Sequence, residues 1–465
     1  MLILEFLMFG LLTIMIGLML MKKNIKKLYL ITLLSITAMV LILHLSFGLV
    51  RWQFYPIYLA IILFGIGFYI IQIRGLMVST FVRRGILLVS SILFFISLGS
   101  ALVFPVYEIP NPSGDYAIGT ESYVIEDVSR EELYSDEIGD YRKINIQVWY
   151  PAETIEGYDV APWLEDGVEV SRGLSKDMGF PFFLLDHTAE IMSNSYVGAP
   201  INEDLNQYPV MIISHGWGGF KNIHTDLAEE LASNGYIVVA IDHTYGSVAT
   251  VFEDEVVYQS EEALPQRDQV DDFLTYANQL VSTYAGDITT TINYLEELND
   301  TDLSSKFNGR LDLTKIGLLG HSTGGGAGVM IALNDERIDA FIGLDAWVEP
   351  IDETDINQGL LIPSLFLRSE SWEEGFNNTK LMALIDESDY PSLLYQIDGT
   401  THFDFAMVYM YSPLTSYIGF SGDIDSDYFN SIMKTMMLDF FEGSFNSDVS
   451  EEIDTDQWDE VKQIR

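Results

Sequence analysis

The chain has 465 residues, 48% of them hydrophobic, which is enough for two or three structural units. Its 68 Asp and Glu outnumber 24 Lys and Arg, and the formal net charge of −44 argues against nucleic-acid binding, because such a surface repels phosphates. The chain has no cysteine, so disulfides, thiol nucleophiles and Cys-ligated metal sites are excluded.

The first part of the chain is apolar and basic. Residues 1–106 contain eight Lys and Arg and one acid, Glu5, for a charge of +7, whereas the remainder carries −51. Four apolar runs lie in this part: Met1 to Met21, Leu28 to Val50, Tyr55 to Ile73 and Gly85 to Val106. Each is close to the roughly 20 residues that a helix needs to cross a bilayer. We therefore expect a transmembrane region of four helices over residues 1–106, with buried helices of a soluble domain as the alternative.

The basic residues between the runs predict an orientation. Four lie between the first and second runs (Lys22, Lys23, Lys26 and Lys27), three between the third and fourth (Arg74, Arg83 and Arg84), and only Arg51 between the second and third. Because Lys and Arg in short loops stay cytoplasmic, we expect a multi-pass protein of the cell membrane with everything after Val106 on the outer face. A signal peptide in the first run, or cleavage after Gly99-Ser100-Ala101, is the alternative. His44, in the second run, is expected to pack rather than relay protons, since no acidic partner for it is expected.

From about Glu108 onward, short apolar runs alternate with longer amphipathic segments. The expected strands are Lys143 to Trp149, Val210 to Ser214, Tyr236 to Asp242, Lys315 to Leu319, Ala340 to Leu344, Pro363 to Arg368 and Ser392 to Ile397. The expected helices are Asn222 to Ser233, Asp268 to Leu298, Gly324 to Ala332, Asn377 to Asp386 and Asp427 to Phe441. This alternation predicts an α/β domain over residues 107–446, with a mostly parallel sheet and helices on both faces.

Two segments depart from the alternation. Residues 154–207 are interpreted as an insertion that lines a pocket and is the candidate for a lid. Four of its aromatic residues are expected in that pocket: Trp163, Phe180, Phe182 and Phe183. Residues 447–465 are interpreted as a frayed acidic tail.

The chemistry centres on Ser322. The run Lys315 to Leu319 leads directly into Gly-His-Ser-Thr-Gly-Gly-Gly at 320–326 and then into a helical segment. Gly-x-Ser-x-Gly between a strand and a helix is the nucleophile elbow of the α/β-hydrolase fold, where a sharp turn exposes the serine. We therefore expect Ser322 to be a catalytic nucleophile.

The α/β-hydrolase order of serine, acid and histidine points to a partner base downstream. His402 is the only histidine after Ser322, and it follows the strand Ser392 to Ile397. Asp345 ends an apolar strand at the same sheet edge and is the preferred acid. Asp386, Asp398 and Glu370 are the alternatives. The other histidines of this part either precede the nucleophile (His187, His215, His224 and His243) or, in the case of His321, are expected to pack beside the elbow.

An oxyanion needs two backbone donors, and the N–H of Thr323, directly after the nucleophile, is expected to be one. The second is expected from Trp217, in the Gly-rich stretch Ser-His-Gly-Trp-Gly-Gly at 214–219. This stretch lacks the features of a phosphate-binding loop. The alternating acids Asp423, Asp425 and Asp427 lack the Gly and the twelfth ligand of a calcium loop, and are expected to begin a helix. No cofactor and no metal is expected.

Taken together, these motifs resemble the lipoprotein-associated platelet-activating factor acetylhydrolase family. The resemblance covers about residues 140–445 and is carried by Ser-His-Gly-Trp-Gly-Gly-Phe at 214–220, Gly-His-Ser-Thr-Gly-Gly at 320–325, Leu-Asp-Ala-Trp at 344–347, Gly-Thr-Thr-His at 399–402 and Gly-Asp-Ile-Asp-Ser at 422–426. It implies that Asp345 is the triad acid and that Trp217 supplies an oxyanion donor. It also implies calcium-independent hydrolysis of short or oxidised sn-2 acyl chains of phospholipids.

The sequence thus predicts a membrane-anchored serine ester hydrolase that acts on lipid or small ester substrates. The acidic domain is expected to favour neutral or zwitterionic esters over anionic ones. A general carboxylesterase or a cutinase-like polyester hydrolase, with a similar elbow, is the nearest alternative. A membrane sensor or transporter carrying a regulatory hydrolase-like domain is a further one.

Overall fold

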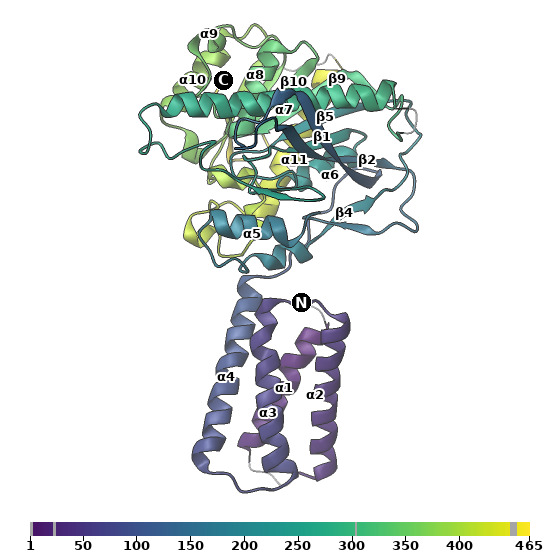
Figure 1. Ribbon diagram of the computed structural model, residues 1–465, viewed down its shortest axis with the longest axis vertical. Helices are drawn as coiled ribbons and strands as arrows, with labels where there is room; N and C mark the ends of the chain where they lie inside the picture. The colour runs from purple at the N-terminus through teal and green to yellow at the C-terminus, as the bar shows by residue number, and fades with distance from the viewer. Residues whose placement is uncertain (1–2, 22–24, 303–304, 447–452) are drawn as a thin grey trace.

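The computed structural model describes residues 3–21, 25–302, 305–446 and 453–465. Met1, Lys22, Lys23 and the tail residues 447–452, on which some of the expectations fall, lie outside the described residues. Figure 1 shows two parts: a bundle of four helices, and an α/β domain stacked on one end of it.

The bundle consists of α1 (Ile3–Leu20), α2 (Lys27–Phe47), α3 (Tyr55–Phe68), continued by a π-helical turn at Tyr69–Ile73, and α4 (Thr80–Val103). In the described part of the chain, four helical segments are long and apolar enough to cross a membrane by length and composition, with mean hydropathy of 2.1 to 2.5 over their most apolar windows. The fourth begins at Thr80, five residues before the expected Gly85, because Ser79 caps it and accepts a hydrogen bond from Val82 N. The helices run alternately down and up, so the α2–α3 connection faces the α/β domain (Figure 1).

The expectation that His44 has no acidic partner is wrong. His44 Nε2 lies 3.8 Å from Glu5 Oε1 of α1, and its Nδ1 lies 3.0 Å from the Tyr58 hydroxyl of α3. Arg51 donates through Nη2 to Glu5 Oε1 at 2.8 Å. Glu5 lies in the first turn of α1 and Arg51 lies just after α2. The two residues are far apart in the sequence and meet only because the helices pack together, so no local pattern predicts the pair.

The α/β domain is built on an eleven-stranded sheet in the order β13-β12-β11-β10-β9-β5-β6-β2-β1-β4-β3. Its strands are β1 (Ala117–Glu131), β2 (Tyr141–Ala152), β3 (Val160–Pro162), β4 (Met192–Val197), β5 (Tyr208–Ser214), β6 (Ile237–Asp242), β9 (Leu311–His321), β10 (Ile338–Leu344), β11 (Ser364–Ser369), β12 (Ser392–Ile397) and β13 (Val461–Gln463). A separate hairpin pairs β7 (Ala249–Val251) with β8 (Val256–Tyr258). The six neighbouring strands β12, β11, β10, β9, β5 and β6 are mutually parallel, as expected from their continuous apolar runs.

Helices cover both faces of this sheet. They are α5 (Val168–Asp177), α6 (Thr225–Ser233), α7 (Phe273–Asp300), α8 (Thr323–Asn334), α9 (Glu353–Ile356), α10 (Phe376–Glu387) and α11 (Ser426–Phe445). One core packs α7, α8 and α10 on the sheet, and the other packs α6 and α11 on the opposite face. The predicted α/β architecture is therefore confirmed. The helices expected at Asn222 and Asp268 begin later, at Thr225 and Phe273; Asp272 caps the second of these.

Both irregular segments contain strands that the sequence did not predict. Residues 154–207 include β3 and β4, which extend the sheet beyond β1, as well as α5. The tail is not frayed throughout, since β13 pairs antiparallel with β12 and Trp458 and Val461 are buried against the second core. A three-residue strand among acidic residues gives no periodic pattern by which the sequence could reveal it.

Candidate active site

Ser322 occupies a strained turn between β9 and α8. Its backbone is in the left-handed region (φ 52°, ψ −115°), a conformation that non-glycine residues rarely adopt. Hydrogen bonds hold the turn on both sides: Ser322 N donates to Leu344 O at 3.0 Å, and Trp347 N donates to Ser322 O at 2.9 Å. Side chains at Gly320 and Gly324 would overlap neighbouring backbone, so both positions need glycine. This geometry is that of a nucleophile elbow.

Asp345 and His402 come together beside this turn. His402 Nδ1 lies 3.0 Å from Asp345 Oδ2. The aspartate is buried, and Ser369 at the end of β11 donates to it twice, from its backbone N to Oδ1 at 2.8 Å and from its hydroxyl to Oδ2 at 2.6 Å. The carboxylate is thereby fixed in orientation, and it can hold the imidazole with Nε2 turned away from it.

Residues that the sequence reasoning missed complete the support of His402. The Trp372 ring stacks on the imidazole, with ring centroids 4.3 Å apart and planes 6° from parallel. Ser371 Oγ accepts a hydrogen bond from His402 N at 3.1 Å. Both follow β11 in the run Ser369 to Trp372, and their nearness to the strand end was the available signal.

His321 packs beside the elbow, as expected. Its Nε2 lies 3.1 Å from His402 O. Burial and the neighbouring His402 lower the pKa of His321 well below its usual range, so it stays neutral at physiological pH.

The alternative acids are engaged elsewhere. Asp398 pairs with Lys462, Asp386 with Arg465, and Glu370 accepts from Gly399 N. Of the four carboxylates considered, Asp345 is the one within hydrogen-bonding distance of the His402 ring.

The loop that carries Trp217 packs directly against the nucleophile. A Cβ at Gly216 would lie 2.9 Å from Ser322 Cβ, so this loop can approach so closely only because residue 216 is glycine. Among the described residues, the backbone N–H of Trp217 donates no hydrogen bond. Thr323 is the first residue of α8, and its N–H has no partner within the helix. Both donors are therefore available to a ligand.

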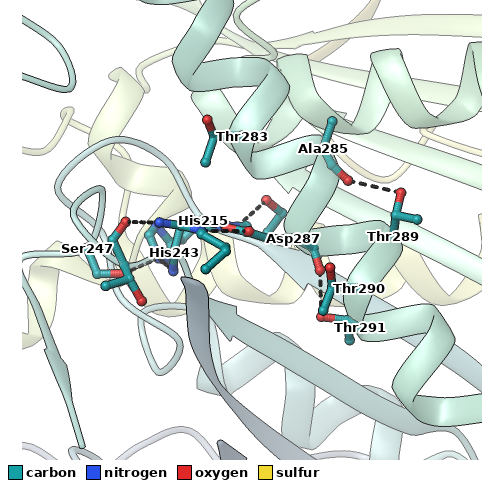
Figure 2. A network of polar contacts seen from close by, with 12 residues as sticks. His215, His243, Ser247, Thr283, Ala285, Asp287, Thr289, Thr290 and Thr291 are labelled. Carbon is teal, nitrogen blue, oxygen red and sulfur yellow. Dashed lines mark hydrogen bonds and ion pairs between the residues drawn. The ribbon is translucent and has the colours of Figure 1, made fainter. Parts of the chain in front are cut away.

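A buried polar network anchors this loop from behind (Figure 2). His243 bridges Ser214 Oγ through Nε2 at 2.8 Å and Asp287 Oδ2 through Nδ1 at 2.9 Å. Asp287 also accepts from Arg142, at 2.9 and 2.6 Å. His215 Nε2 in turn lies 2.9 Å from Ser247 Oγ. Ser214, His243 and Asp287 have the residue types and contacts of a catalytic triad, but all three are fully buried and therefore cannot contact a substrate. Their hydrogen bonds fix the end of β5, from which the Trp217 loop begins.

A cavity of about 270 Å³ opens beside Ser322 and His402. Its further lining comes mostly from apolar and aromatic side chains of α5, the Trp217 loop and the segment after His402, namely Leu174, Met178, Ile223, Phe403, Ala406, Val408, Tyr411 and Phe420, together with the acid Asp177. Gln259, in the amide orientation that satisfies both neighbours, accepts from Trp217 Nε1 at 2.8 Å and donates to Asp177 Oδ1 at 2.7 Å. The cavity is therefore apolar with one anchored polar wall.

Of the four aromatic residues of residues 154–207 that were expected to line a pocket, two do so, but not in the cavity beside Ser322. Trp163 is fully buried in a core cluster and donates to Asn222 O at 2.8 Å. Phe182 and Phe183 line a different cavity, near the helical bundle, and Phe180 does not line the catalytic cavity. Residues 154–207 contribute instead through α5. Of the three alternating acids, Asp425 caps α11 by accepting from Tyr428 N at 3.0 Å, as expected for a helix start.

Comparison with known proteins agrees with this geometry. Residues 101–464 match the family model described as platelet-activating factor acetylhydrolase, isoform II. The platelet-activating factor acetylhydrolase of Canis lupus familiaris is 26% identical over 374 residues, covering 76% of this chain and 80% of the relative; that of Gallus gallus is 22% identical over 389 residues, covering 76% and 87%. Cutinase est2 of Thermobifida alba is 24% identical over 205 residues, covering 43% of this chain and 54% of the cutinase.

A ferulic acid esterase from Streptomyces cinnamoneus shares the fold, with a TM-score of 0.62 at 22% identity over 77% of this chain and all of that one. The family model covers far more than half of the chain, including the elbow, Asp345 and His402. The chain belongs to the platelet-activating factor acetylhydrolase, isoform II, family and is a serine carboxylic-ester hydrolase.

Proposed function

We propose that this protein is a membrane-anchored esterase that removes short sn-2 acyl chains from phospholipids or related lipid esters at its outer face. The observation that carries the proposal is the strained Ser322 beside the Asp345–His402 pair, in one cavity. The cavity of about 270 Å³ is at or below the roughly 300–1,000 Å³ typical of ligand pockets, which favours a short acyl chain.

In the proposed mechanism, Ser322 Oγ attacks the ester carbonyl carbon while His402 Nε2 takes the hydroxyl proton. Asp345 stabilises the imidazolium through Nδ1, and the N–H groups of Trp217 and Thr323 donate to the tetrahedral oxyanion. His402 then protonates the departing alcohol. Water, deprotonated by His402, releases the acyl group from Ser322 by the same route.

The four apolar helices support the anchoring. The described basic residues Lys26, Lys27, Arg74, Arg83 and Arg84 lie at or near the ends of the helices remote from the α/β domain. Because such residues favour the cytoplasmic side, the α/β domain is proposed to face outward.

The test is hydrolysis by the full chain in detergent, with chelator present, of sn-2-acetyl and long-chain phosphatidylcholine and of a p-nitrophenyl ester series. Ser322→Ala should lose at least about three powers of ten in kcat, whereas the matched Ser431→Ala, at an exposed position on α11, should not. Retained activity in Ser322→Ala would refute the nucleophile. Activity on simple esters with none on either phospholipid would favour the cutinase-like or carboxylesterase alternative. The similarity to a cutinase and to a ferulic acid esterase is the observation that favours this alternative.

A further inference from the structure

A second cavity, of about 550 Å³, lies where the helical bundle meets the α/β domain. One wall is the α2–α3 connection, including Arg51, Trp52 and Tyr55, and the other is the segment around α5, including Arg172 and Phe183. Figure 1 shows α5 close above the ends of the helices. This cavity shares none of its lining residues with the cavity beside Ser322.

The joint around this cavity is well packed. Trp52 Nε1 donates to Leu184 O at 3.2 Å, and the Trp52 ring meets the Phe183 ring with centroids 5.4 Å apart. The Phe104 ring, after α4, lies 5.5 Å from the His187 ring. The two parts are thus joined by side-chain contacts at the cavity wall.

Arg51 in this wall has unused hydrogen-bonding capacity. Its side chain is 5% exposed, and Nη2 donates to Glu5 Oε1, but Nε and Nη1 have no hydrogen-bond partner among the described residues. Guanidinium is always charged, and buried donors without acceptors are costly, so an anionic oxygen is the group that such a site lacks. Arg172 adds a second cation, 3.4 Å from Asp186 Oδ1.

The lining also suits a cation next to that anion. Asp186 and Glu190 are acidic, and Trp52, Phe182 and Phe183 present aromatic rings, which attract ammonium groups. Phosphate and ammonium occur together in the headgroup of a zwitterionic phospholipid. Headgroups lie at the level of the cavity when the helices span a bilayer.

We propose that this junction cavity binds the headgroup of one zwitterionic phospholipid of the outer leaflet, with the phosphate at Arg51 and Arg172 and the ammonium at the acidic and aromatic wall. The proposal rests on the membrane anchoring proposed above. The bound lipid is a permanent ligand of the joint and not the substrate, because Ser322 lies in the other cavity.

The test is native mass spectrometry of the delipidated full chain in detergent, titrated with dioleoylphosphatidylcholine. One saturable lipid should bind, and Arg51→Gln and Arg172→Gln should each weaken it about tenfold or more. Arg267→Gln should leave it unchanged, because this exposed arginine pairs with Glu349 and does not line the junction cavity. Because Arg51→Gln leaves Glu5 without this partner and can disturb the bundle, Arg172→Gln is the decisive variant.

Two further probes separate the sources of the ligand. Dioleoylglycerol, with the same chains and no headgroup, should bind at least tenfold more weakly; equal binding, or unchanged phosphatidylcholine binding in Arg172→Gln, would overturn the proposal. Displacement of the lipid by micromolar phosphocholine would overturn the proposal that the ligand is a bilayer lipid and would favour a soluble ligand. Carbonate extraction of the membranes before detergent is added, and p-nitrophenyl acetate hydrolysis by the purified samples, report separately on the anchoring and on the esterase.

Discussion

Asp287 is a fully buried carboxylate surrounded by cations. Although burial alone would raise its pKa, the Arg142 guanidinium and hydrogen bonds from Arg142 and His243 hold the pKa of Asp287 well below its usual range. Arg130 also contacts it at 2.7 Å. The ionised carboxylate orients His243, and His243 orients Ser214 at the start of the loop that carries Trp217.

Asp287→Asn should therefore destabilise the protein by about 3–5 kcal/mol, because it removes the carboxylate 2.6 Å from the buried Arg142 guanidinium and leaves Glu132 as the remaining ion-pair partner of that group. Chemical denaturation of the full chain in detergent measures this loss. The exposed Glu336→Gln, which removes an acid without breaking this network, should change stability by no more than about 0.5 kcal/mol. Equal stability of the two variants would show that the network contributes little.

His187 is a buried neutral histidine near the helical bundle. Burial lowers its pKa to about 4, and its Nε2 lies 3.0 Å from Tyr411 O, on a residue that lines the catalytic cavity. A pKa lower in the folded than in the unfolded state means that the unfolded chain binds more protons between pH 6.5 and 4. Stability from this residue is present above pH 6.5 and is lost as the pH falls through that window.

His187→Gln should remove this dependence, since Gln does not titrate. Between pH 7.5 and 5.0 the wild type should lose about 2 kcal/mol more than the variant, by the free energy of a shifted pKa. Thermal unfolding of both proteins at the two pH values measures the difference, and groups common to both cancel. Parallel melting curves at the two pH values would contradict a buried, neutral His187.

At the scale of single elements, β13 shows how a distant segment supports the site. It pairs with β12, with Val461 opposite Ile397, directly before the turn that leads to His402. Trp458 and Val461 pack into the core on the α6 and α11 face. The edge strand β13 thus stabilises β12, the strand that precedes the proposed catalytic base His402.

Val461→Asp should weaken both stability and activity, because it introduces a charge into a buried apolar position. The melting temperature should fall by several degrees, and kcat on p-nitrophenyl acetate should fall with it. Gln463→Asp, at an exposed position of the same strand, should change the melting temperature far less. Equal effects of both substitutions would mean that β13 does not pack as described.

The elements that could be predicted from the sequence are those whose pattern is local. The parallel strands β5, β6, β9, β10, β11 and β12 are continuous apolar runs, and the elbow at Ser322 is a contiguous motif. The long antiparallel strand β1 was missed because its burial is mixed, with one side only partly covered. β4 was missed because its buried residues, Ser193 and Ser195, are polar, whereas its apolar residues Met192 and Val197 are exposed.

The Asp345–His402 pair was predictable because both residues follow strands that end at one sheet edge. The network at Asp287 was not, because its carboxylate lies within the 28-residue helix α7 among many polar residues. Ser214 and His243 each lie at or next to the end of a buried strand, which was the one available signal. The pairing of Glu5 with Arg51 likewise depends on helix packing that no local pattern encodes.

At the scale of the whole molecule, charge separates the two parts. The sequence after residue 106 carries −51, and an acidic side chain, Asp177, lines the cavity beside Ser322. Burial raises the pKa of Asp177. The negative electrostatic potential that a substrate encounters therefore comes mainly from the many other acidic residues of this part of the chain. The summed charge repels anions over distances set by the Debye length, about 30 Å at 10 mM salt and about 3 Å at 1 M.

Short-chain phosphatidylcholine should therefore be hydrolysed with a higher kcat/KM than phosphatidylglycerol of identical chains, by about tenfold or more at 10 mM salt. The ratio should fall toward one at 1 M salt, because screening removes the long-range field and leaves the local contacts unchanged. Rates on monomeric lipids below the micelle concentration, measured with the full chain in a nonionic detergent, provide the comparison. p-Nitrophenyl acetate, which is uncharged, controls for effects of salt on the chemistry. A ratio that does not change with salt would locate the discrimination in direct contacts at the cavity, and a preference for the anionic lipid would contradict the electrostatic account.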